Sequence, residues 1–391
     1  MDLDKILKEE IDGLKRANLY RTLKKVEGSI EPVILIDGRE FINLSSNNYL
    51  GLTTHPRLIE ASINATKRYG TGSGASRLIS GNVELYEELE EKIAEFKGTE
   101  SSVVFSTGYM ANLGIIASLV ESQDLVIIDK LSHASIIDGC RLSGGKLRVY
   151  PHKDLEKLER ILRRGGNYRR RLIVTDGVFS MDGDIAPLPE LLALAKKYEA
   201  FLMVDDAHST GVLGKEGRGT LEYFGLEDKQ IIQMGTLSKA LGSLGGFVAA
   251  SSILIDWIRN RARSLIYSTA LPASVLATAI SAIQVISSEP TLRGMLWKNV
   301  KSFKDGLVQL GYNIMDSQTQ IVPILVGDTE KTIELAKYLY EEGIYAPPIR
   351  PPTVPKGQSR IRTSLMATHT ESHIDKALSL LKKAGRKLGI I

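Results

Sequence analysis

Cysteine and long apolar runs are nearly absent from this chain of 391 residues. Cys140 is its single cysteine, so an internal disulfide is impossible and no cysteine cluster can hold a metal. No apolar run approaches the roughly 18 residues that a membrane span needs. The N-terminal residues 1–16 alternate in charge, where a signal peptide has an apolar core. These absences predict a cytoplasmic protein without a metal site or a membrane partner.

An excess of either charge is also missing. The chain has 50 Lys and Arg against 46 Asp and Glu, a net charge of +4, which is too small to indicate a nucleic-acid partner. The run 163–172, "RRGGNYRRRL", is locally basic, but Tyr168 is its only aromatic residue. We therefore interpret it as a solvated loop and not as a surface on which bases stack.

Short apolar runs alternate with helical patterns between residues 84 and 251. Continuous apolar strands separated by helices are typical of a mostly parallel sheet with helices on both faces. The sequence therefore predicts an α/β fold. The expected strands are 101–106, 124–129, 146–150, 171–177, 201–207, 231–235 and 246–251.

The two ends of the chain follow different patterns. Residues 3–25 have the apolar spacing of an amphipathic helix, and 32–44 predict a hairpin that turns at Asp37 and Gly38. Beyond residue 288, helices and a few strands predict a small α+β domain. We expect an N-terminal helix and hairpin arm, a large domain and a smaller C-terminal domain, at residues 1–50, 51–288 and 289–391.

Polar side chains gather where the expected strands end, and ligands of open α/β sheets bind beyond the carboxyl ends of strands. After the first strand, "STGYMAN" (106–112) opens a helix, whose free N–H groups and dipole suit a phosphate. Each of these residues, taken singly, could be an ordinary cap or turn. In chain order the later strands deliver His133, Ser180, Asp205, Asp206, His208, Thr236, Ser238 and Lys239.

Lys239 stands in "GTLSKALGSLGG" (235–246) and has no charged neighbour between Gln233 and Ser252. An uncharged setting of small residues favours a neutral, nucleophilic amine. A lysine of this kind, a carboxylate, imidazoles and an anion cradle are the groups needed to hold pyridoxal 5'-phosphate (PLP). We therefore expect PLP to be the cofactor.

The motifs "STGYMAN", "SHAS", "TDGVFSMDGD", "VDDAHSTG" and "GTLSKALGSLGG" occur in an order that resembles the α-oxoamine synthases. The resemblance runs from "LSSNNYLGL" to "SRIRTSLMATHT", nearly the whole chain. It implies a PLP-dependent transferase of fold type I that condenses an amino acid with an acyl thioester and releases CO₂ and free thiol. It also implies a homodimer in which both subunits complete each site.

The resemblance assigns cofactor roles to individual residues. Lys239 is similar to the lysine that binds PLP covalently and transfers the substrate proton, and Asp205 to the partner of the pyridinium nitrogen. His208 resembles the ligand of the ring 3-oxygen, and His133 the imidazole stacked on the ring beside the substrate. Further cofactor contacts are implied for Gly108, Tyr109, Ser180 and Thr236, and for Thr269 reaching the phosphate of the partner subunit.

Substrate positions follow from the same resemblance. In "RIRTS", Arg362 resembles the arginine that grips the amino acid carboxylate, a bidentate task that suits arginine better than lysine. Arg360 competes with it, since one sequence does not show which strand face points inward. Further positions similar to substrate-binding residues are Arg21, Asn47, Ser76 and Thr353.

The branch of the family is indicated by two segments. Residues 347–370 and "IYSTALP" (266–272) are most similar to the branch of biotin biosynthesis, which condenses L-alanine with pimeloyl-CoA or a pimeloyl-carrier protein. Ser76 leaves space for the methyl group of alanine, where the threonine of some relatives would favour glycine; one methyl group is worth about 1–3 kcal/mol. The alternatives are an enzyme that uses glycine and acetyl-CoA, one of broad specificity, and an aminotransferase on the same fold.

Overall fold

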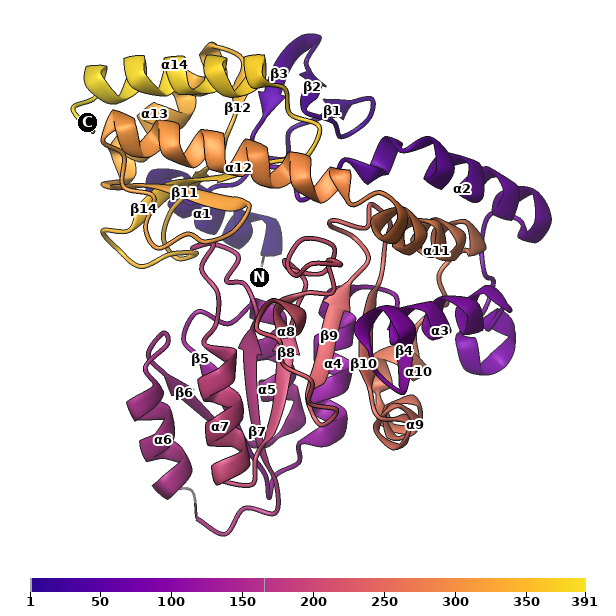
Figure 1. Ribbon diagram of the computed structural model, residues 1–391. Helices are drawn as coiled ribbons and strands as arrows, with labels where there is room; N and C mark the ends of the chain where they lie inside the picture. The colour runs from indigo at the N-terminus through magenta and orange to yellow at the C-terminus, as the bar shows by residue number, and fades with distance from the viewer. Residues whose placement is uncertain (1, 165) are drawn as a thin grey trace.

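The computed structural model describes residues 2–164 and 166–391, so Met1 and Gly165 of the basic run lie outside the described residues. Its largest sheet has seven strands in the order β4-β10-β9-β8-β7-β5-β6 (Figure 1). β10 is antiparallel to both neighbours, and the other six strands share one direction, which confirms the mostly parallel sheet. The strands are β4 (Ser101–Phe105), β5 (Leu125–Asp129), β6 (Lys146–Tyr150), β7 (Arg171–Asp176), β8 (Phe201–Asp205), β9 (Ile232–Thr236) and β10 (Gly246–Ala250).

Both faces of this sheet are covered, as the apolar strands predicted. All of β5 is buried: Val126 and Ile128 pack with α4 and α5, and Leu125 and Ile127 pack with α6 and α7 on the other face. Alternate residues of a strand point to opposite faces, so a strand buried twice must be apolar throughout. These four helices are α4 (Gly108–Leu119), α5 (Ala134–Ser143), α6 (Leu155–Arg164) and α7 (Leu188–Lys197).

A smaller sheet lies above the large one in Figure 1, beside three helices. Its strands are β11 (Ile321–Gly327), β14 (Ser359–Ser364) and β13 (Pro348–Ile349), with antiparallel pairing throughout. The helices of this region are α12 (Thr291–Leu310), α13 (Thr329–Glu341) and α14 (Glu371–Lys387). The remaining helical segments are η1 (Leu52–Thr54), α2 (Pro56–Tyr69), η2 (Arg77–Gly81), α3 (Leu85–Lys97), α8 (Thr220–Tyr223), α9 (Ser252–Arg261), α10 (Arg263–Ile266) and α11 (Ala273–Ser288).

The expected hairpin is present as β2 (Val33–Ile36) and β3 (Arg39–Asn43). Asp37 and Gly38 both have positive φ, as a two-residue hairpin turn of type I′ requires. β1 (Val26–Glu27) extends one edge, and β12 (Ile344–Tyr345) pairs in parallel with β3 on the other. The hairpin thus shares a sheet with a segment close to the C-terminus, and the three-domain division of the chain stays a prediction.

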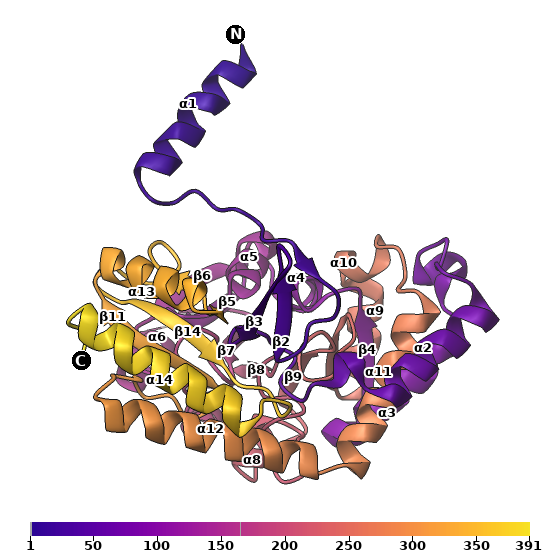
Figure 2. The same ribbon diagram turned by 90° about the horizontal axis from the view of Figure 1, so that it is seen from above.

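The first helix is shorter than expected. α1 covers Leu3–Arg16, so the expectation of a helix over 3–25 was wrong beyond residue 16. Asn18 takes a positive φ of 56°, which turns the chain out of the helix although the apolar spacing continues to Leu19. α1 stands away from the rest of the chain (Figure 2), and its apolar side chains are exposed.

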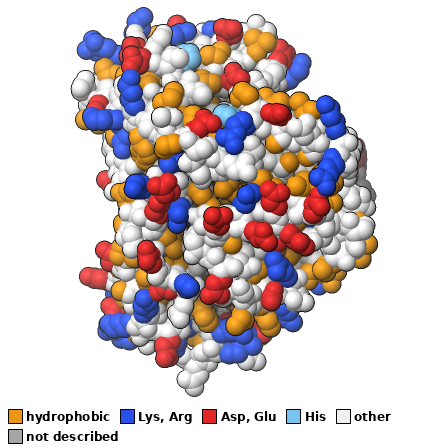
Figure 3. Space-filling view, turned by 45° about the vertical axis from the view of Figure 1, so that its right-hand side comes forward, with side chains coloured by type: hydrophobic (Ala, Val, Ile, Leu, Met, Phe, Trp, Pro, Cys, Tyr) orange, Lys and Arg blue, Asp and Glu red, His pale blue; other side chains and the backbone are white. Residues whose placement is uncertain are grey.

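Surface and helix composition add two observations. On the face seen in Figure 3, acidic and basic side chains are mixed, with hydrophobic side chains between them. Among the described residues, no single helix is both long and apolar enough to cross a bilayer. α11 and α12 pass that test only as a pair bent by 76°, and by length and composition alone.

Candidate active site

Asp205, the last residue of β8, has a buried carboxylate held by two donors. Its Oδ2 accepts from Asn112 Nδ2 on α4 at 2.7 Å, and its Oδ1 accepts from the backbone N of Ala207 at 3.0 Å. Both contacts hold the carboxylate in a fixed orientation. Asn112 was not expected at the site, although it is the last residue of the "STGYMAN" motif.

Asp176 lies beside Asp205, because the two residues are in register at the ends of β7 and β8. Burial, with the charge of Asp205 added, raises the pKa of Asp176 well above its usual range. Its Oδ2 accepts from the backbone N of His133 at 3.1 Å. Asp176 was not among the residues expected at the site; its place at a strand end, in "TDGVFSMDGD", was the available signal.

Lys239 follows the end of β9 by three residues. Burial lowers the pKa of its amine to about 8; the charges of Asp205 and Asp176 oppose this shift, and the charge of Arg362 adds to it. A larger neutral fraction therefore exists at pH 7 than for a solvated lysine, as the uncharged sequence around Lys239 predicted.

The N-terminus of α4 presents free backbone donors. Thr107 caps the helix by accepting from Met110 N at 3.1 Å. Within the described part of the chain, the N–H groups of Gly108 and Tyr109 have no acceptor. A Cβ on Gly246 would lie 2.6 Å from the Cα of Gly108, so glycine there lets β10 approach the helix end closely. Such a terminus is an anion-binding site.

Two groups of residues flank this helix end. A Cβ on Gly108 would lie 3.3 Å from Thr236 Oγ1, so Thr236 is adjacent to the free donors. On the other side Ser106 Oγ donates to the carbonyl of Thr269 at 3.1 Å, and Thr269 forms an isolated antiparallel bridge with Ser76. Thr269 and Ser76 therefore lie side by side near the end of β4.

His133 is the N-cap of α5, and its Nδ1 lies 2.7 Å from Ser135 Oγ. Its ring meets the ring of Tyr109 edge-on, with centroids 6.4 Å apart. Burial lowers the pKa of His133; Asp205 opposes this shift and Lys239 adds to it. The imidazole is therefore in the electrostatic range of both, as the prediction of a common site requires.

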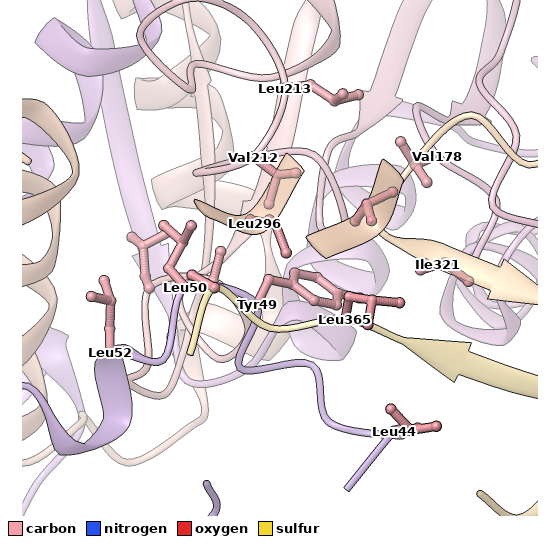
Figure 4. Close-up of a cluster of buried hydrophobic side chains, with 14 of the residues drawn as sticks. Leu44, Tyr49, Leu50, Leu52, Val178, Val212, Leu213, Leu296, Ile321 and Leu365 are labelled. Carbon is pink, nitrogen blue, oxygen red and sulfur yellow. The ribbon is translucent and has the colours of Figure 1, made fainter. Parts of the chain in front are cut away.

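His208 is buried, and its Nδ1 lies 2.7 Å from the hydroxyl of Tyr49. Burial, with the charges of Lys239 and Arg362, lowers the pKa of His208 well below its usual range, so the ring is neutral. Tyr49 is fixed in the hydrophobic cluster drawn in Figure 4, and its hydroxyl also donates to Asn47 Oδ1 at 3.1 Å. Tyr49 was not among the residues expected at the site, although it lies in the "LSSNNYLGL" segment that resembles the family.

Arg362 and Arg360 differ in their partners, although both are on β14. Arg362 Nε donates to the carbonyl of Ser180 at 2.7 Å, and its Nη2 to Asn47 Oδ1 at 3.3 Å. Arg360 is fully buried and pairs with Asp182 at 2.8 Å. Besides burial, the charge of Arg362 contributes to the lowered pKa values of Lys239 and His208, so Arg362 lies within electrostatic range of both.

Arg21 and Thr353 are brought together, about 330 positions apart in sequence. Both line a groove of about 1030 Å³ between residues 14–24, α13 and the 345–353 segment. Among the described residues that line this groove, none belongs to the group around Lys239. The structure therefore places Arg21 and Thr353 in a second cluster.

Comparison with known proteins gives the family. The model of "aminotransferase class I and II" matches residues 39–381. The chain belongs to this family. A relative from Symbiobacterium thermophilum named 8-amino-7-oxononanoate synthase is 50% identical over 392 residues and covers 100% of both chains.

Solved structures give the same result. A serine palmitoyltransferase from S. paucimobilis with bound PLP superimposes with a TM-score of 0.94, at 36% identity over 100% of both chains. An 8-amino-7-oxononanoate synthase from Francisella tularensis has a TM-score of 0.78 and 31% identity, covering 89% of this chain and 98% of its own. The chain is thus an α-oxoamine synthase, a PLP-dependent enzyme of fold type I, as its motifs predicted.

The residues around Lys239 fit this cofactor. Free N–H groups at the start of α4 suit its phosphate, and the Asp205 carboxylate suits a protonated ring nitrogen. The amine of Lys239, with its lowered pKa, suits attack on the cofactor aldehyde.

Proposed function

We propose that this enzyme condenses L-alanine with pimeloyl-CoA, or with a pimeloyl-carrier protein, to 8-amino-7-oxononanoate, CO₂ and free thiol, in biotin biosynthesis. The observation that carries the proposal is 50% identity, over the full length, to the Symbiobacterium thermophilum enzyme of that name. The chemistry of the residues around Lys239 supports it, because an amine with a lowered pKa, a buried carboxylate and neutral imidazoles lie together.

PLP, when bound, supplies an electron sink for the bonds that break and form at the substrate α-carbon. In this proposal Lys239 would hold the cofactor through Nζ. Once the amine of alanine has displaced Nζ from the cofactor, the freed amine of Lys239 would take the α-proton of alanine and later return a proton to the product. Asp205 would keep the ring nitrogen protonated, and His133 would cover the ring face. His208, whose Nδ1 lies 2.7 Å from the hydroxyl of Tyr49, would bind the 3-oxygen.

Arg362 and Asn47 hold the carboxylate of alanine in the same proposal. Their bond of 3.3 Å fixes the guanidinium beside the carbonyl of Ser180. A fixed carboxylate sets which bond to the α-carbon is aligned with the cofactor ring, and this alignment decides which bond breaks. Arg21 and Thr353 bind the acyl donor in the groove that they share.

The N–H groups of Gly108 and Tyr109 would bind the cofactor phosphate, and Ser180 and Thr236 would make further cofactor contacts. We propose further that the enzyme is a cytoplasmic homodimer, in which Thr269 of the partner subunit completes each phosphate site. Exposed apolar side chains near the Ser76–Thr269 bridge support a covered surface there, because such residues are usually buried in an interface. They are Leu78, Ile79 and Tyr267.

Free-thiol release from acyl-CoA tests the proposed function. The PLP-loaded enzyme is given pimeloyl-, acetyl- or palmitoyl-CoA with alanine, glycine or serine, and a Lys239→Ala variant is the blank. Pimeloyl-CoA with alanine is expected to give the highest kcat/KM. Dominance of acetyl-CoA with glycine, or of palmitoyl-CoA with serine, would reject the proposed substrates. Conversion of alanine to a keto acid without thiol release would indicate an aminotransferase.

Ser76 gives a specificity prediction. Ser76→Thr adds one methyl group, which we expect to crowd the methyl group of alanine and to spare glycine. The ratio of kcat/KM for alanine to that for glycine should fall about 10-fold or more. Competition assays with both amino acids measure the ratio, and Ser76→Ala, which adds no bulk, is the control. An unchanged ratio would place Ser76 away from the α-substituent.

A further inference from the structure

His152 joins two buried carboxylates outside the cofactor residues. Its Nδ1 lies 3.0 Å from Asp129 Oδ1, and its Nε2 lies 2.9 Å from Asp184 Oδ2. An ionised carboxylate can only accept, so both ring nitrogens must carry protons. Burial opposes this charge, but the two carboxylates outweigh it and raise the pKa of His152 to about 9. The side chain is an imidazolium at neutral pH.

One carboxylate lies at the end of a strand of the large sheet, and the other lies in a loop that follows a different strand. Asp129 ends β5 and also accepts from the backbone N of Leu131 at 2.8 Å and of Lys153 at 2.9 Å. Asp184 lies in the loop after β7 and also accepts from Lys153 Nζ at 2.7 Å. The imidazolium therefore ties the end of β5 to that loop.

The same loop, residues 179–184, is packed against the His152 ring and closed by its own backbone. The ring of Phe179 meets that of His152 edge-on, with centroids 4.4 Å apart. The backbone N of Gly183 donates to the carbonyl of Phe179 at 2.8 Å. Gly183 has a φ of 71°, and a Cβ there would lie 2.1 Å from the carbonyl oxygen of Ile321. The loop is thus packed between the end of the large sheet and β11.

The opposite side of the 179–184 loop supplies acceptors to β14. The carbonyl of Ser180 accepts from Arg362 Nε at 2.7 Å, and Asp182 accepts from Arg360 at 2.8 Å. A displacement of the loop would move the acceptor that orients the guanidinium of Arg362. The contacts therefore form one continuous path from His152 through Asp184 and Ser180 to Arg362.

We propose that His152 is a positioning residue, which fixes the 179–184 loop through Asp184 and thereby holds the guanidinium of Arg362 for the carboxylate of the amino acid substrate. The inference rests on the proposed function, because that function assigns the carboxylate to Arg362. Since the path ends at Arg362, loss of His152 weakens the binding of amino acid and leaves the acyl donor unaffected.

Amino acid binding without turnover is the direct test. PLP-loaded wild type and His152→Gly are titrated with L-alanine in the absence of acyl donor, and the cofactor absorbance reports the Kd. We expect the Kd to rise about 10-fold, which corresponds to a coupling of about 1.4 kcal/mol, while the KM for acyl-CoA changes less than twofold. Added imidazole should restore the Kd. 1-Methylimidazole, whose cation has a single N–H, should not.

A matched control and a second variant separate the possible outcomes. His55 forms another histidine–carboxylate pair, with Glu289 at 3.5 Å, and His55→Gly should leave the Kd unchanged. If His152→Gly does not fold, as thermal unfolding will tell, His152→Gln replaces it and should give a smaller rise in Kd, because it keeps one donor. An unchanged Kd in a folded His152 variant would overturn the inference.

Arg362→Ala distinguishes this failure from a failure of the proposed function. A raised Kd in Arg362→Ala together with an unchanged Kd in the His152 variant would reject the role of His152 alone. An unchanged Kd in Arg362→Ala would reject the assigned role of Arg362 and the inference with it. If another amino acid is the preferred substrate, the same titration applies, because the carboxylate is common to all of them.

Discussion

Replacement of Lys239 by alanine is expected to lower kcat by about 10⁴-fold or more, because it removes both the covalent nucleophile and the proton-transfer base. The lowered pKa of about 8 matters for this expectation, since it keeps part of the amine neutral near pH 7. Thiol release under saturating substrates and PLP measures the loss. The absorbance of the cofactor should change as well, because it can no longer be bound covalently.

The control for Lys239 is a lysine on the surface. Lys229 is exposed, and Lys229→Ala should leave both kcat and the cofactor absorbance unchanged. Activity of Lys239→Ala above about one per cent of wild type would contradict its double role, since general-base catalysis alone contributes about 10²–10⁴-fold.

Asp205→Asn is expected to lower kcat by about 10²–10³-fold, the equivalent of losing one buried charge interaction of about 3–4 kcal/mol. The amide is nearly isosteric but neutral, so it cannot keep the ring nitrogen protonated. The amide also replaces one acceptor oxygen by an NH₂ group. This new donor would face another donor, either the Nδ2 of Asn112 or the N–H of Ala207. Steady-state kinetics at saturating PLP separates slow chemistry from weak cofactor binding.

The adjacent Asp206 offers a contrast to Asp205. Its buried carboxylate pairs with Lys97 at 3.0 Å and accepts from Ser209 and Thr220. Asp206→Asn leaves the Lys97 ammonium without its counter-charge, so it should lower the free energy of unfolding by about 3 kcal/mol or more. If a folded Asp206→Asn variant lost as much kcat as Asp205→Asn, the distinction between a catalytic role for Asp205 and a stabilising role for Asp206 would be wrong.

The large sheet could be predicted because its signals are local. Each strand such as β5 is a short apolar run between helical patterns, and the carboxyl ends of parallel strands meet at one edge. Asp205, His208 and Lys239 could therefore be expected together before any contact was known. The one clear error was the extension of the first helix to residue 25. It arose because apolar residues keep a helical spacing past Asn18, where the backbone turns out of the helix.

Contacts between distant segments could not be predicted. Tyr49 and His208 are 159 positions apart, and no residue pattern in either segment indicates that the two side chains meet. Arg360 and Arg362 are two residues apart on one strand, so side-chain alternation places them on the same face. Knowledge of which strand face points inward would therefore not have distinguished them. Their partners in the 179–184 loop, Asp182 and the carbonyl of Ser180, make the distinction.

The parallel pairing of β3 with β12 has a consequence for synthesis of the chain. β12 leaves the ribosome about 300 residues after β3, which at roughly 5–20 residues per second is a delay of about 15–60 s. Throughout this interval the N-terminal hairpin has an open edge, of the kind that recruits strands from other chains. The edge of the N-terminal sheet is therefore paired only when translation is nearly complete. Chains that stop before residue 344 would keep an unpaired strand edge that can bind strands of other chains.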